Sequence, residues 1–135
     1  MKKVLTVGVF DLLHVGHIEL FRKAKALGDY LIVAVQESDS VFQFKPGADL
    51  VYSTEERYYM VSAIRYVDEV IIYRDVVDIV KEVDFDIFAK GPDQSHAGFQ
   101  YVVDYCSQSN KEIVIMPRTE GISSSELKNL IKCMK

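Results

Sequence analysis

The stretch 3–17, KVLTVGVFDLLHVGH, decides the fold. Its first five residues, Lys3 to Val7, are rich in β-branched side chains and predict a buried strand. After His17, apolar residues recur at helical spacing as far as Leu27, and Gly28 is placed to end that helix. A buried strand that leads directly into a helix is the repeating unit of sheets with parallel strands.

The same alternation continues along the chain. Short apolar runs predict four further strands, at 30–35, 70–73, 87–89 and 113–116. Helices are predicted after Ser53, near 76–83, over 98–108 and from Ser124 to about Lys132, and two of them begin with capping boxes, Ser53 with Glu56 and Ser123 with Glu126. The polar stretch from Gln36 to Tyr52 lacks both periodicities and predicts an irregular loop.

These patterns predict an α/β fold for residues 1–135, taken as one domain. We expect a Rossmann-like open sheet of five parallel strands with helices on both faces. In such sheets ligands bind outside the carboxyl ends of the strands, at a topological switch point. The loops that follow the strands ending near Val7, Val35, Ala89 and Met116 are therefore the expected functional edge.

Composition excludes several classes of protein. Hydrophobic residues make up 49% of the 135 residues, which is enough for one core. The formal net charge of -4 argues against a nucleic-acid binder that depends on a general basic field. Two cysteines give no disulfide framework, and the first apolar run is too short for a secretion signal or a membrane span, so we expect a soluble cytoplasmic protein.

The loop after the first strand contains two of the three histidines in the chain. His14 and His17 flank Gly16 where a helix begins, and Gly8 opens the turn. A helix start offers free N–H groups and partial positive charge, which favour a phosphate. Gly16 has no side chain to obstruct the close approach of that phosphate. The two histidines are then candidates for donating hydrogen bonds to phosphate oxygens that gain charge in a transition state.

Two alternative interpretations of this loop stay open. The histidines are also compatible with a solvated helix terminus, the default for a lone histidine. A His-x-x-His pair can bind zinc, but zinc needs a further ligand, and His96 is remote in the sequence. The coincidence of both histidines with the expected ligand edge favours the phosphate interpretation.

Three segments together resemble the cytidylyltransferase family. The segment from Gly8 to His17 is similar to its HxGH signature, and 118–124, RTEGISS, is similar to its RTEGIS signature. Glu56-Arg57 with 65–70, RYVDEV, resembles a third family segment. The likeness covers nearly the whole chain in order, and the short chain most resembles the branch that acts on glycerol 3-phosphate.

The resemblance implies a reaction and a set of site residues. A phosphate monoester would attack the α-phosphorus of CTP, giving a CDP-alcohol and pyrophosphate, for the synthesis of cell-surface polymer or capsule precursors. His14, His17, Lys45 and Arg118 would be catalytic. The nucleotide would be bound by Gly8, Val9, Phe10, Gly16, Asp93, Arg118, Thr119, Gly121, Ile122, Ser123 and Ser124. Asp11, Arg57, Arg65 and Asp68 would support the acceptor or the structure, the last two near a subunit interface and the site.

Other expectations rest on the same resemblance. Lys45 would reach the triphosphate from a lid formed by residues 36–52, Mg²⁺ would be held through the nucleotide phosphates, and the protein would be a homodimer. Without the resemblance, Lys45 and Arg118 would be ordinary surface residues, Ser123 and Ser124 helix caps, and Arg57 and Arg65 exposed or paired with acids.

The acceptor and the nucleotide stay open as predictions. Val9 stands where the most similar enzymes often have Thr, Lys45 is the only lysine between Lys25 and Lys81, and Gly91-Pro92-Asp93-Gln94 lacks a Trp usual there. These differences keep ethanolamine phosphate, choline phosphate or another polyol phosphate as alternative acceptors. An ATP-dependent adenylyltransferase and a non-catalytic nucleotide-binding module are the less favoured alternatives.

Overall fold

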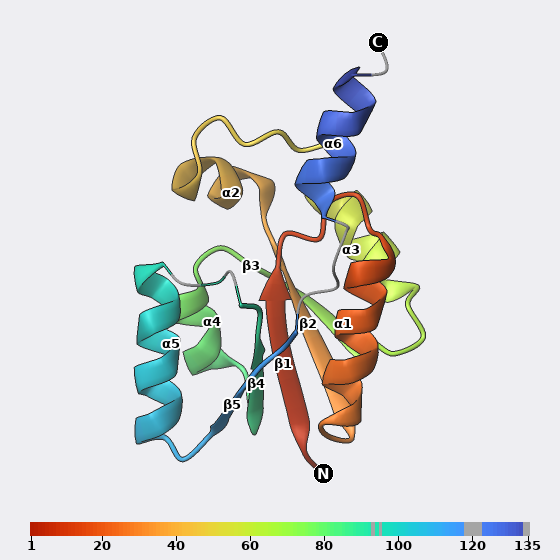
Figure 1. The fold of residues 1–135 in the computed structure, drawn as a ribbon. Helices are drawn as coiled ribbons and strands as arrows, with labels where there is room; N and C mark the ends of the chain where they lie inside the picture. The colour runs from red at the N-terminus through yellow and green to blue at the C-terminus, as the bar shows by residue number, and fades with distance from the viewer. Residues whose placement is uncertain (93, 95, 118–122, 134–135) are drawn as a thin grey trace.

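Five parallel strands form one sheet in the computed structural model, which describes residues 1–92, 94, 96–117 and 123–133 (Figure 1). The strands are β1 (Lys3–Gly8), β2 (Tyr30–Gln36), β3 (Glu69–Tyr73), β4 (Ile87–Lys90) and β5 (Glu112–Ile115). Their order across the sheet is β3-β2-β1-β4-β5, and each neighbouring pair is parallel. The predicted open parallel sheet of five strands is confirmed.

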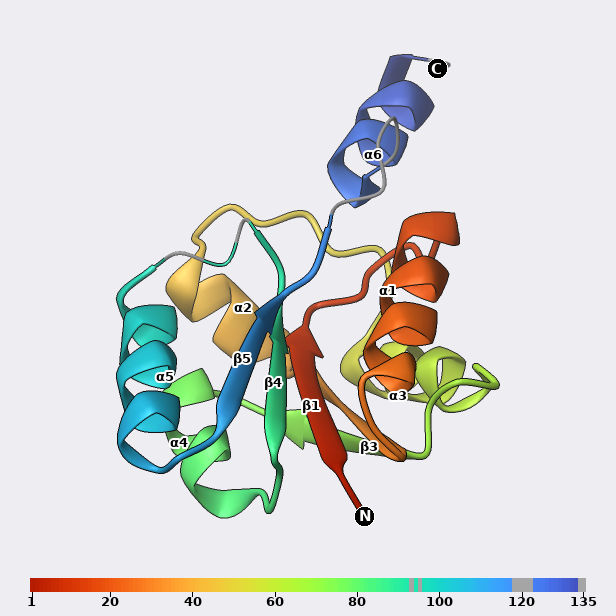
Figure 2. The same cartoon turned by 60° about the horizontal axis from the view of Figure 1, so that its bottom comes forward.

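Helices cover both faces of this sheet (Figures 1 and 2). They are α1 (Val15–Ala26), α2 (Ser38–Phe44), α3 (Thr54–Ser62), α4 (Val76–Glu82), α5 (Ala97–Gln108) and α6 (Ser124–Cys133). Helices α1 and α3 pack on one face and α4 and α5 on the other, whereas α2 and α6 lie beyond the carboxyl ends of the strands. Among the described helices, no segment has the length and apolar character that crossing a membrane requires.

The central strand β1 supplies both cores. Leu5 and Val7 face the core beneath α4 and α5, while Val4 faces the core beneath α1 and α3. All three side chains are buried, as the continuous apolar run predicts for a strand covered on both faces. The chain order reverses between β1 and β4, so the switch point lies where β1 ends at Gly8.

Helix α2 lies within the stretch 36–52 that the sequence predicts to be irregular, and that prediction is wrong for Ser38–Phe44. The helix has seven residues and no side-chain N-cap, too short a span to show helical periodicity. Tertiary contacts hold it instead, because Ser40 and Val41 are buried and the Ser38 N–H donates to Thr54 Oγ1 at 3.0 Å.

Arg57 is fully buried, so the default interpretation without the family resemblance, an exposed or acid-paired side chain, is wrong. Its Nη1 donates to the carbonyl oxygens of Val9 at 2.9 Å and Gln36 at 2.6 Å. Its Nη2 donates to Ser38 Oγ at 2.7 Å and its Nε to the Tyr52 carbonyl at 3.3 Å. One guanidinium therefore joins the carboxyl ends of β1 and β2 to both ends of the segment that carries α2.

We expect Arg57→Lys to lower the free energy of unfolding by about 2–3 kcal/mol, because an ammonium cannot replace the planar fork of donors to four oxygens. Urea denaturation measures the change as a lower midpoint. Arg22→Lys is the matched control, since Arg22 is exposed and bonds Glu19 on its own helix, and should change stability by less than about 0.5 kcal/mol. Equal effects of the two substitutions would contradict the assignment.

Candidate active site

The turn between β1 and α1 has an unusual backbone, and Gly8 leaves space beside it for the ring of Phe10. Phe10 and Leu12 have positive φ angles of 56° and 49°, which bulky residues rarely adopt. A Cβ atom on Gly8 would lie 2.8 Å from the Phe10 ring. The ring therefore folds back over the strand end, where it packs edge-on against Phe21 at 5.1 Å and His17 at 5.6 Å between centroids.

His14 and His17 form a reciprocal capping box at the start of α1. Nδ1 of His14 accepts from the Gly16 N–H at 3.0 Å, and Nδ1 of His17 accepts from the His14 N–H at 3.2 Å. Since each Nδ1 is an acceptor, the proton of each neutral ring is assigned to Nε2. The helix cap thus leaves two imidazole Nε2–H groups as donors for a ligand, with ring centroids 4.0 Å apart.

Burial keeps both histidines neutral at physiological pH. It lowers the pKa of His14 below its usual value. Burial and, to a smaller extent, the neighbouring His14 lower the pKa of His17 to about 4, although Asp11 opposes this. Protonation of either Nδ1 would also remove the acceptor that the helix cap requires. These histidines can therefore stabilise an anion as neutral hydrogen-bond donors.

Asp11 holds the turn in place. Its side chain is 3% exposed, and it accepts from the N–H groups of Val51 at 2.8 Å and Tyr52 at 3.0 Å and from Lys128 Nζ at 2.8 Å. Burial opposes its ionisation, but Lys128 and the two N–H groups outweigh burial and lower the pKa of Asp11. Both oxygens of this carboxylate are committed to the protein.

A cavity of about 560 Å³ opens above the carboxyl end of β1. The β1–α1 turn, the end of α2 and its following loop, the loop after β4 and one face of α6 all line it. It brings together seven residues predicted for the site, namely Gly8, Val9, Phe10, Asp11, His17, Lys45 and Ser124. Ser124 Oγ donates to the Asp11 carbonyl at 2.6 Å, and Ser123 Oγ caps α6 by accepting from the Glu126 N–H at 3.1 Å.

The structure does not bring every predicted residue to this cavity. The described residues that were predicted for the site but do not line it include His14, Gly16, Arg57 and Ser123. Asp68 lies at the amino edge of the sheet, where it accepts from the Leu31 N–H at 2.8 Å and pairs with Lys25. The expectation that Asp68 lies near the site is therefore wrong, because that edge is opposite the carboxyl ends. Arg65 is exposed after α3. The predicted residues Asp93, Arg118, Thr119, Gly121 and Ile122 are outside the described residues.

Sequence reasoning missed several residues at this edge. Lys128 and Lys132 line the cavity from α6. Ser124, Lys128 and Lys132 follow one another at intervals of four residues, a spacing that could have placed all three on one helix face. Gln94 was named within the segment 91–94 but not predicted for the site. Its Nε2 donates to the Val7 carbonyl at 2.9 Å, and its Oε1 accepts from the Gly91 N–H at 3.0 Å. This side chain fixes the loop after β4 to the end of β1.

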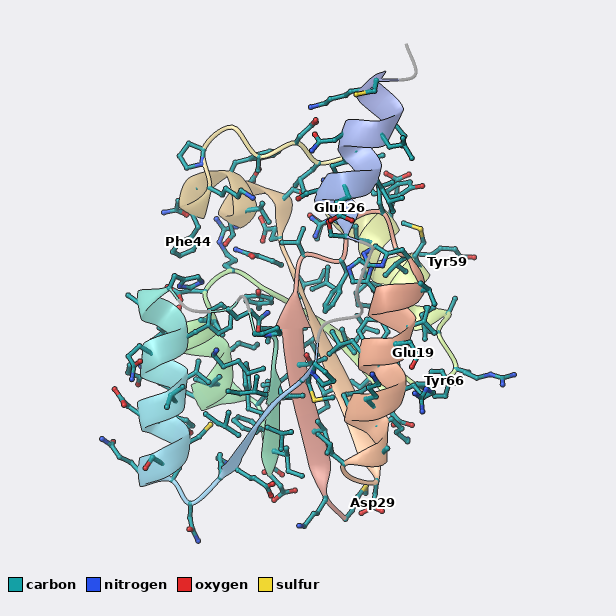
Figure 3. All side chains as sticks on the ribbon, viewed as in Figure 1. Glu19, Asp29, Phe44, Tyr59, Tyr66 and Glu126 are labelled. Atoms are coloured by element: carbon teal, nitrogen blue, oxygen red, sulfur yellow. The ribbon has the colours of Figure 1, made fainter. Side chains whose placement is uncertain are left out.

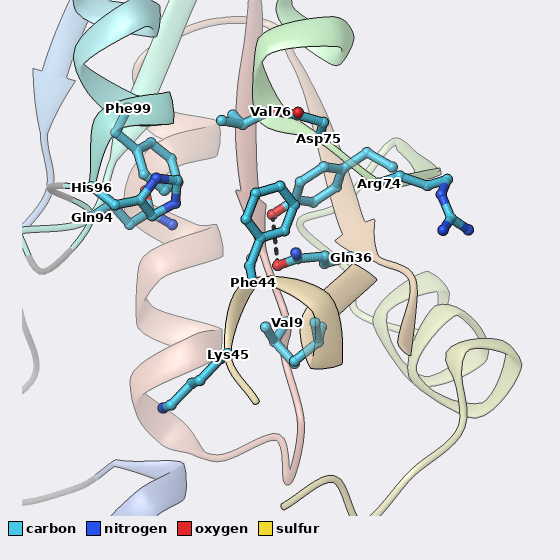
Figure 4. A pocket seen from close by; sticks show the side chains of 13 residues that line it. Val9, Gln36, Phe44, Lys45, Arg74, Asp75, Val76, Gln94, His96 and Phe99 are labelled. Atoms are coloured by element: carbon cyan, nitrogen blue, oxygen red, sulfur yellow. Dashed lines mark hydrogen bonds between the residues drawn. The ribbon is translucent and has the colours of Figure 1, made fainter. Parts of the chain in front are cut away.

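A second cavity of about 370 Å³ lies beside the first (Figure 4). Gly8, Val9, Val41, Lys45 and Gln94 line both cavities, so they form the boundary between the two. The remaining lining comes from the ends of β2 and β3, from the starts of α4 and α5, and from Phe44, which precedes Lys45. The site therefore has two compartments that meet at the end of β1.

Comparison with protein families matches residues 5–130 to the Cytidylyltransferase-like family. The chain belongs to this family of nucleotidyltransferases. It is 40% identical to glycerol-3-phosphate cytidylyltransferase of Bacillus subtilis strain 168 over 134 residues, covering 97% of this chain and 98% of that protein. It is 42% identical to the enzyme of the same name from Staphylococcus aureus strain NCTC 8325 / PS 47 over 131 residues, covering 95% and 93% of the two chains.

Two further similarities bear on the fold and on the choice of nucleotide. A lipopolysaccharide core biosynthesis protein from Thermoplasma volcanium GSS1 has a similar structure, with a TM-score of 0.78, 28% sequence identity, and coverage of 89% of this chain and 99% of that one. An FAD synthase from Thermococcus kodakarensis is 43% identical over 95 residues, which cover 68% of this chain and 63% of that protein.

The neutral state of His17 predicts a pH-dependent stability. The pKa of a histidine in the unfolded chain is 6.5, whereas the pKa of His17 in the folded protein is about 4. Between these values the folded protein binds fewer protons, so its free energy of unfolding decreases as the pH falls from 6.5 towards 4. We expect a loss on the order of 2–3 kcal/mol, measured by urea denaturation at successive pH values.

His17→Gln is the control for this pH dependence. Glutamine at this position of a capping box still accepts from the N-cap N–H, but it does not titrate. The variant should therefore lose most of the slope between pH 6.5 and 4 while staying folded at neutral pH. A slope equal to that of the unmodified protein would assign the effect to other groups.

Proposed function

We propose that this protein transfers CMP from CTP to a small phosphate monoester, with glycerol 3-phosphate as the first candidate, and releases pyrophosphate. The observation that carries the proposal is the pair of imidazole Nε2–H donors beside a cavity at the switch point of the sheet. The 40% identity to a glycerol-3-phosphate cytidylyltransferase over 97% of the chain supports this acceptor.

The proposed reaction is an in-line displacement at the α-phosphorus of CTP. An oxygen of the acceptor phosphate forms the new P–O bond, and the bond to the bridging oxygen of pyrophosphate breaks with its electron pair. The acceptor is already ionised at neutral pH, so the site needs no strong general base. Catalysis then consists of positioning the two phosphates and stabilising the charge that develops on them.

The larger cavity and the helix starts beside it have separate roles in this proposal. His14 and His17 donate to oxygens of the reacting phosphate, Lys45 supplies a positive charge from the end of α2, and Ser123 and Ser124 receive the β- and γ-phosphates at the start of α6. Arg118 adds charge against the triphosphate. Lys128, which Asp11 holds at the cavity wall, extends the same positive surface.

A side-by-side assay tests the proposal. Purified protein with CTP and Mg²⁺ is offered glycerol 3-phosphate, ethanolamine phosphate, choline phosphate and ribitol 5-phosphate, and pyrophosphate release is measured. The same panel with ATP, together with flavin mononucleotide, tests the adenylyl-transfer alternative that the similarity to an FAD synthase keeps open. Faster turnover with CTP and a polyol phosphate is the expected result, and turnover confined to ATP would overturn the proposal.

Loss of either imidazole donor should abolish most turnover. His14→Ala and His17→Ala each remove one hydrogen bond to an oxygen that gains charge, at about 3 kcal/mol, or about a hundredfold or more in kcat. His14→Asn separates this effect from folding, because asparagine preserves the N-cap acceptor. It should match the unmodified protein in melting temperature and His14→Ala in lost activity. Near-normal kcat in His14→Asn would remove His14 from the reaction.

Lys45 should act mainly in the transition state. Its ammonium, delivered from the exposed end of α2, would meet the α-phosphate region as the bond to pyrophosphate breaks. Lys45→Ala should therefore lower kcat much more than it raises the KM for CTP, and Lys45→Arg should restore only part of the loss. Steady-state kinetics in both substrates measures this split. An unchanged kcat in Lys45→Ala would leave the 36–52 segment without the proposed lid function.

We also propose that Mg²⁺ enters with the nucleotide. The described residues contain no group of three metal-ligating side chains, and both oxygens of Asp11 are already bonded to Lys128 and N–H groups. An ion held by the triphosphate and water fits this donor set, since Mg²⁺ retains most of its water ligands. The ion would neutralise phosphate charge, and excess chelator should abolish turnover.

We propose, finally, a cytoplasmic homodimer. The resemblance to the family is the first argument for the dimer. The second is exposed apolar surface: Ile72 on the edge strand β3 is 46% exposed, and Tyr59 on α3 is 77% exposed. Such apolar surface beside an edge strand is suited to pairing. Sedimentation at micromolar concentration should give twice the 15.4 kDa chain mass, and a single-chain mass would contradict the dimer.

A further inference from the structure

His96, far from the other histidines in the sequence, lies in the aromatic wall of the smaller cavity (Figure 4). Its imidazole stacks with Phe44 at 6.4 Å between centroids and an interplanar angle of 13°. The same ring meets Phe99 at 4.5 Å and 60°. Figure 3 shows Phe44 reaching from α2 towards the start of α5, so the two helices face each other across this cavity.

The start of α5 fixes the orientation of the imidazole. His96 is the N-cap of this helix, and its Nδ1 accepts from the Gly98 N–H at 3.1 Å. A Cβ atom on Gly98 would lie 2.8 Å from Cε1 of the ring, so glycine at this position allows the imidazole to lie over the helix start. With Nδ1 used by the cap, the neutral ring carries its proton on Nε2 and presents a hydrogen-bond donor.

The other amides and carboxylates of the smaller cavity are bonded to the protein. The Gln36 side chain bonds Ser40 and Tyr73, and Gln94 bonds the main chain at two points. Asp75 caps α4, and Arg74 pairs with Glu37 at 2.5 Å. Among the side chains that line the cavity, His96 and Lys45 are therefore the donors best placed to bind a polar molecule.

The geometry of the transfer determines which substrate enters this cavity. In an in-line displacement the attacking oxygen approaches the phosphorus from the side opposite the leaving group. The larger cavity holds the α6 residues Ser124, Lys128 and Lys132, which suit the triphosphate end of the nucleotide. The acceptor then approaches from the side of the smaller cavity, and Lys45, which lines both, lies where the two phosphates meet.

We propose that His96 is the acceptor-specificity residue of this protein, with Nε2–H donating to a hydroxyl oxygen on the alcohol part of the acceptor. Phe44 holds the imidazole by stacking, so that α2 contributes Lys45 to the phosphate and Phe44 to the alcohol. The substrate class is a phosphate monoester of a hydroxylated alcohol. This inference rests on the proposed transfer reaction and adds the group that selects its acceptor.

His96→Asn tests the proposal by kinetics. Asparagine keeps the N-cap acceptor, so the melting temperature should not change, but its shorter side chain withdraws the donor from the cavity. The KM for glycerol 3-phosphate should rise about tenfold, as for one lost hydrogen bond, while the KM for CTP stays constant. Gln100→Asn, on the exposed surface of α5, is the control and should change neither constant. An unchanged acceptor KM in His96→Asn would overturn the proposal.

Acceptors that lack one hydroxyl sharpen this test. The unmodified protein should use 3-hydroxypropyl phosphate or 2-hydroxypropyl phosphate about tenfold less efficiently than glycerol 3-phosphate, depending on which hydroxyl meets His96. In His96→Asn the same substrate should lose no further efficiency, because the partner of that hydroxyl is already gone. Equal losses on both analogues in both proteins would show that another group recognises the hydroxyls.

Imidazole signals distinguish failure of this inference from failure of the proposed reaction. The chain has three histidines, so His14, His17 and His96 can be assigned in a ¹H–¹⁵N spectrum with single variants. α,β-Methylene-CTP should shift His14 and His17, and glycerol 3-phosphate added to that complex should shift His96. No response to the nucleotide would refute the transfer reaction. A response of His14 and His17 with His96 unmoved by the acceptor would refute only the role of His96.

Discussion

The site depends on a buried cation that has main-chain and hydroxyl oxygens as partners. Arg57 donates to carbonyl oxygens at the end of β1 and at the end of β2, where parallel strands leave acceptors that the sheet does not use. It also bonds Ser38 at the start of α2 and Tyr52 ahead of α3. An unpaired buried charge would be costly, and these dipoles reduce that cost. Together with the contact between Ser38 and Thr54, this side chain sets the position of α2, and so of Lys45.

The histidine pair shows how a helix cap can also prepare a phosphate site. A Ser or Asp cap would satisfy the helix N–H groups but offer no donor to a ligand. An imidazole at His14 or His17 accepts with Nδ1 and donates with Nε2, so one ring serves both the helix and the substrate. Burial, which keeps His17 neutral, preserves that division of the two nitrogen atoms.

Sequence predicted the parts of the structure that depend on local pattern. The five strands, the capping box at Ser53 and the switch-point turn all follow from periodicity and residue type. Helix α2 did not, because contacts with Thr54 and Arg57 stabilise seven residues that have little helical tendency of their own. The place of His96 was equally hidden, since its partner Phe44 comes from α2 and lies 52 residues earlier in the chain.

Two of the three lysines that line the larger cavity are paired with acids. Lys45, Lys128 and Lys132 line it together with Asp11 and Asp49, which pair with Lys128 and Lys132 respectively. The carboxylates hold the two α6 lysines close to each other without a ligand, because they offset mutual repulsion. The price is a small net positive charge among these groups. A triphosphate carries several negative charges, so its binding here requires further positive charge beyond these lysines, which a divalent ion on the nucleotide would provide.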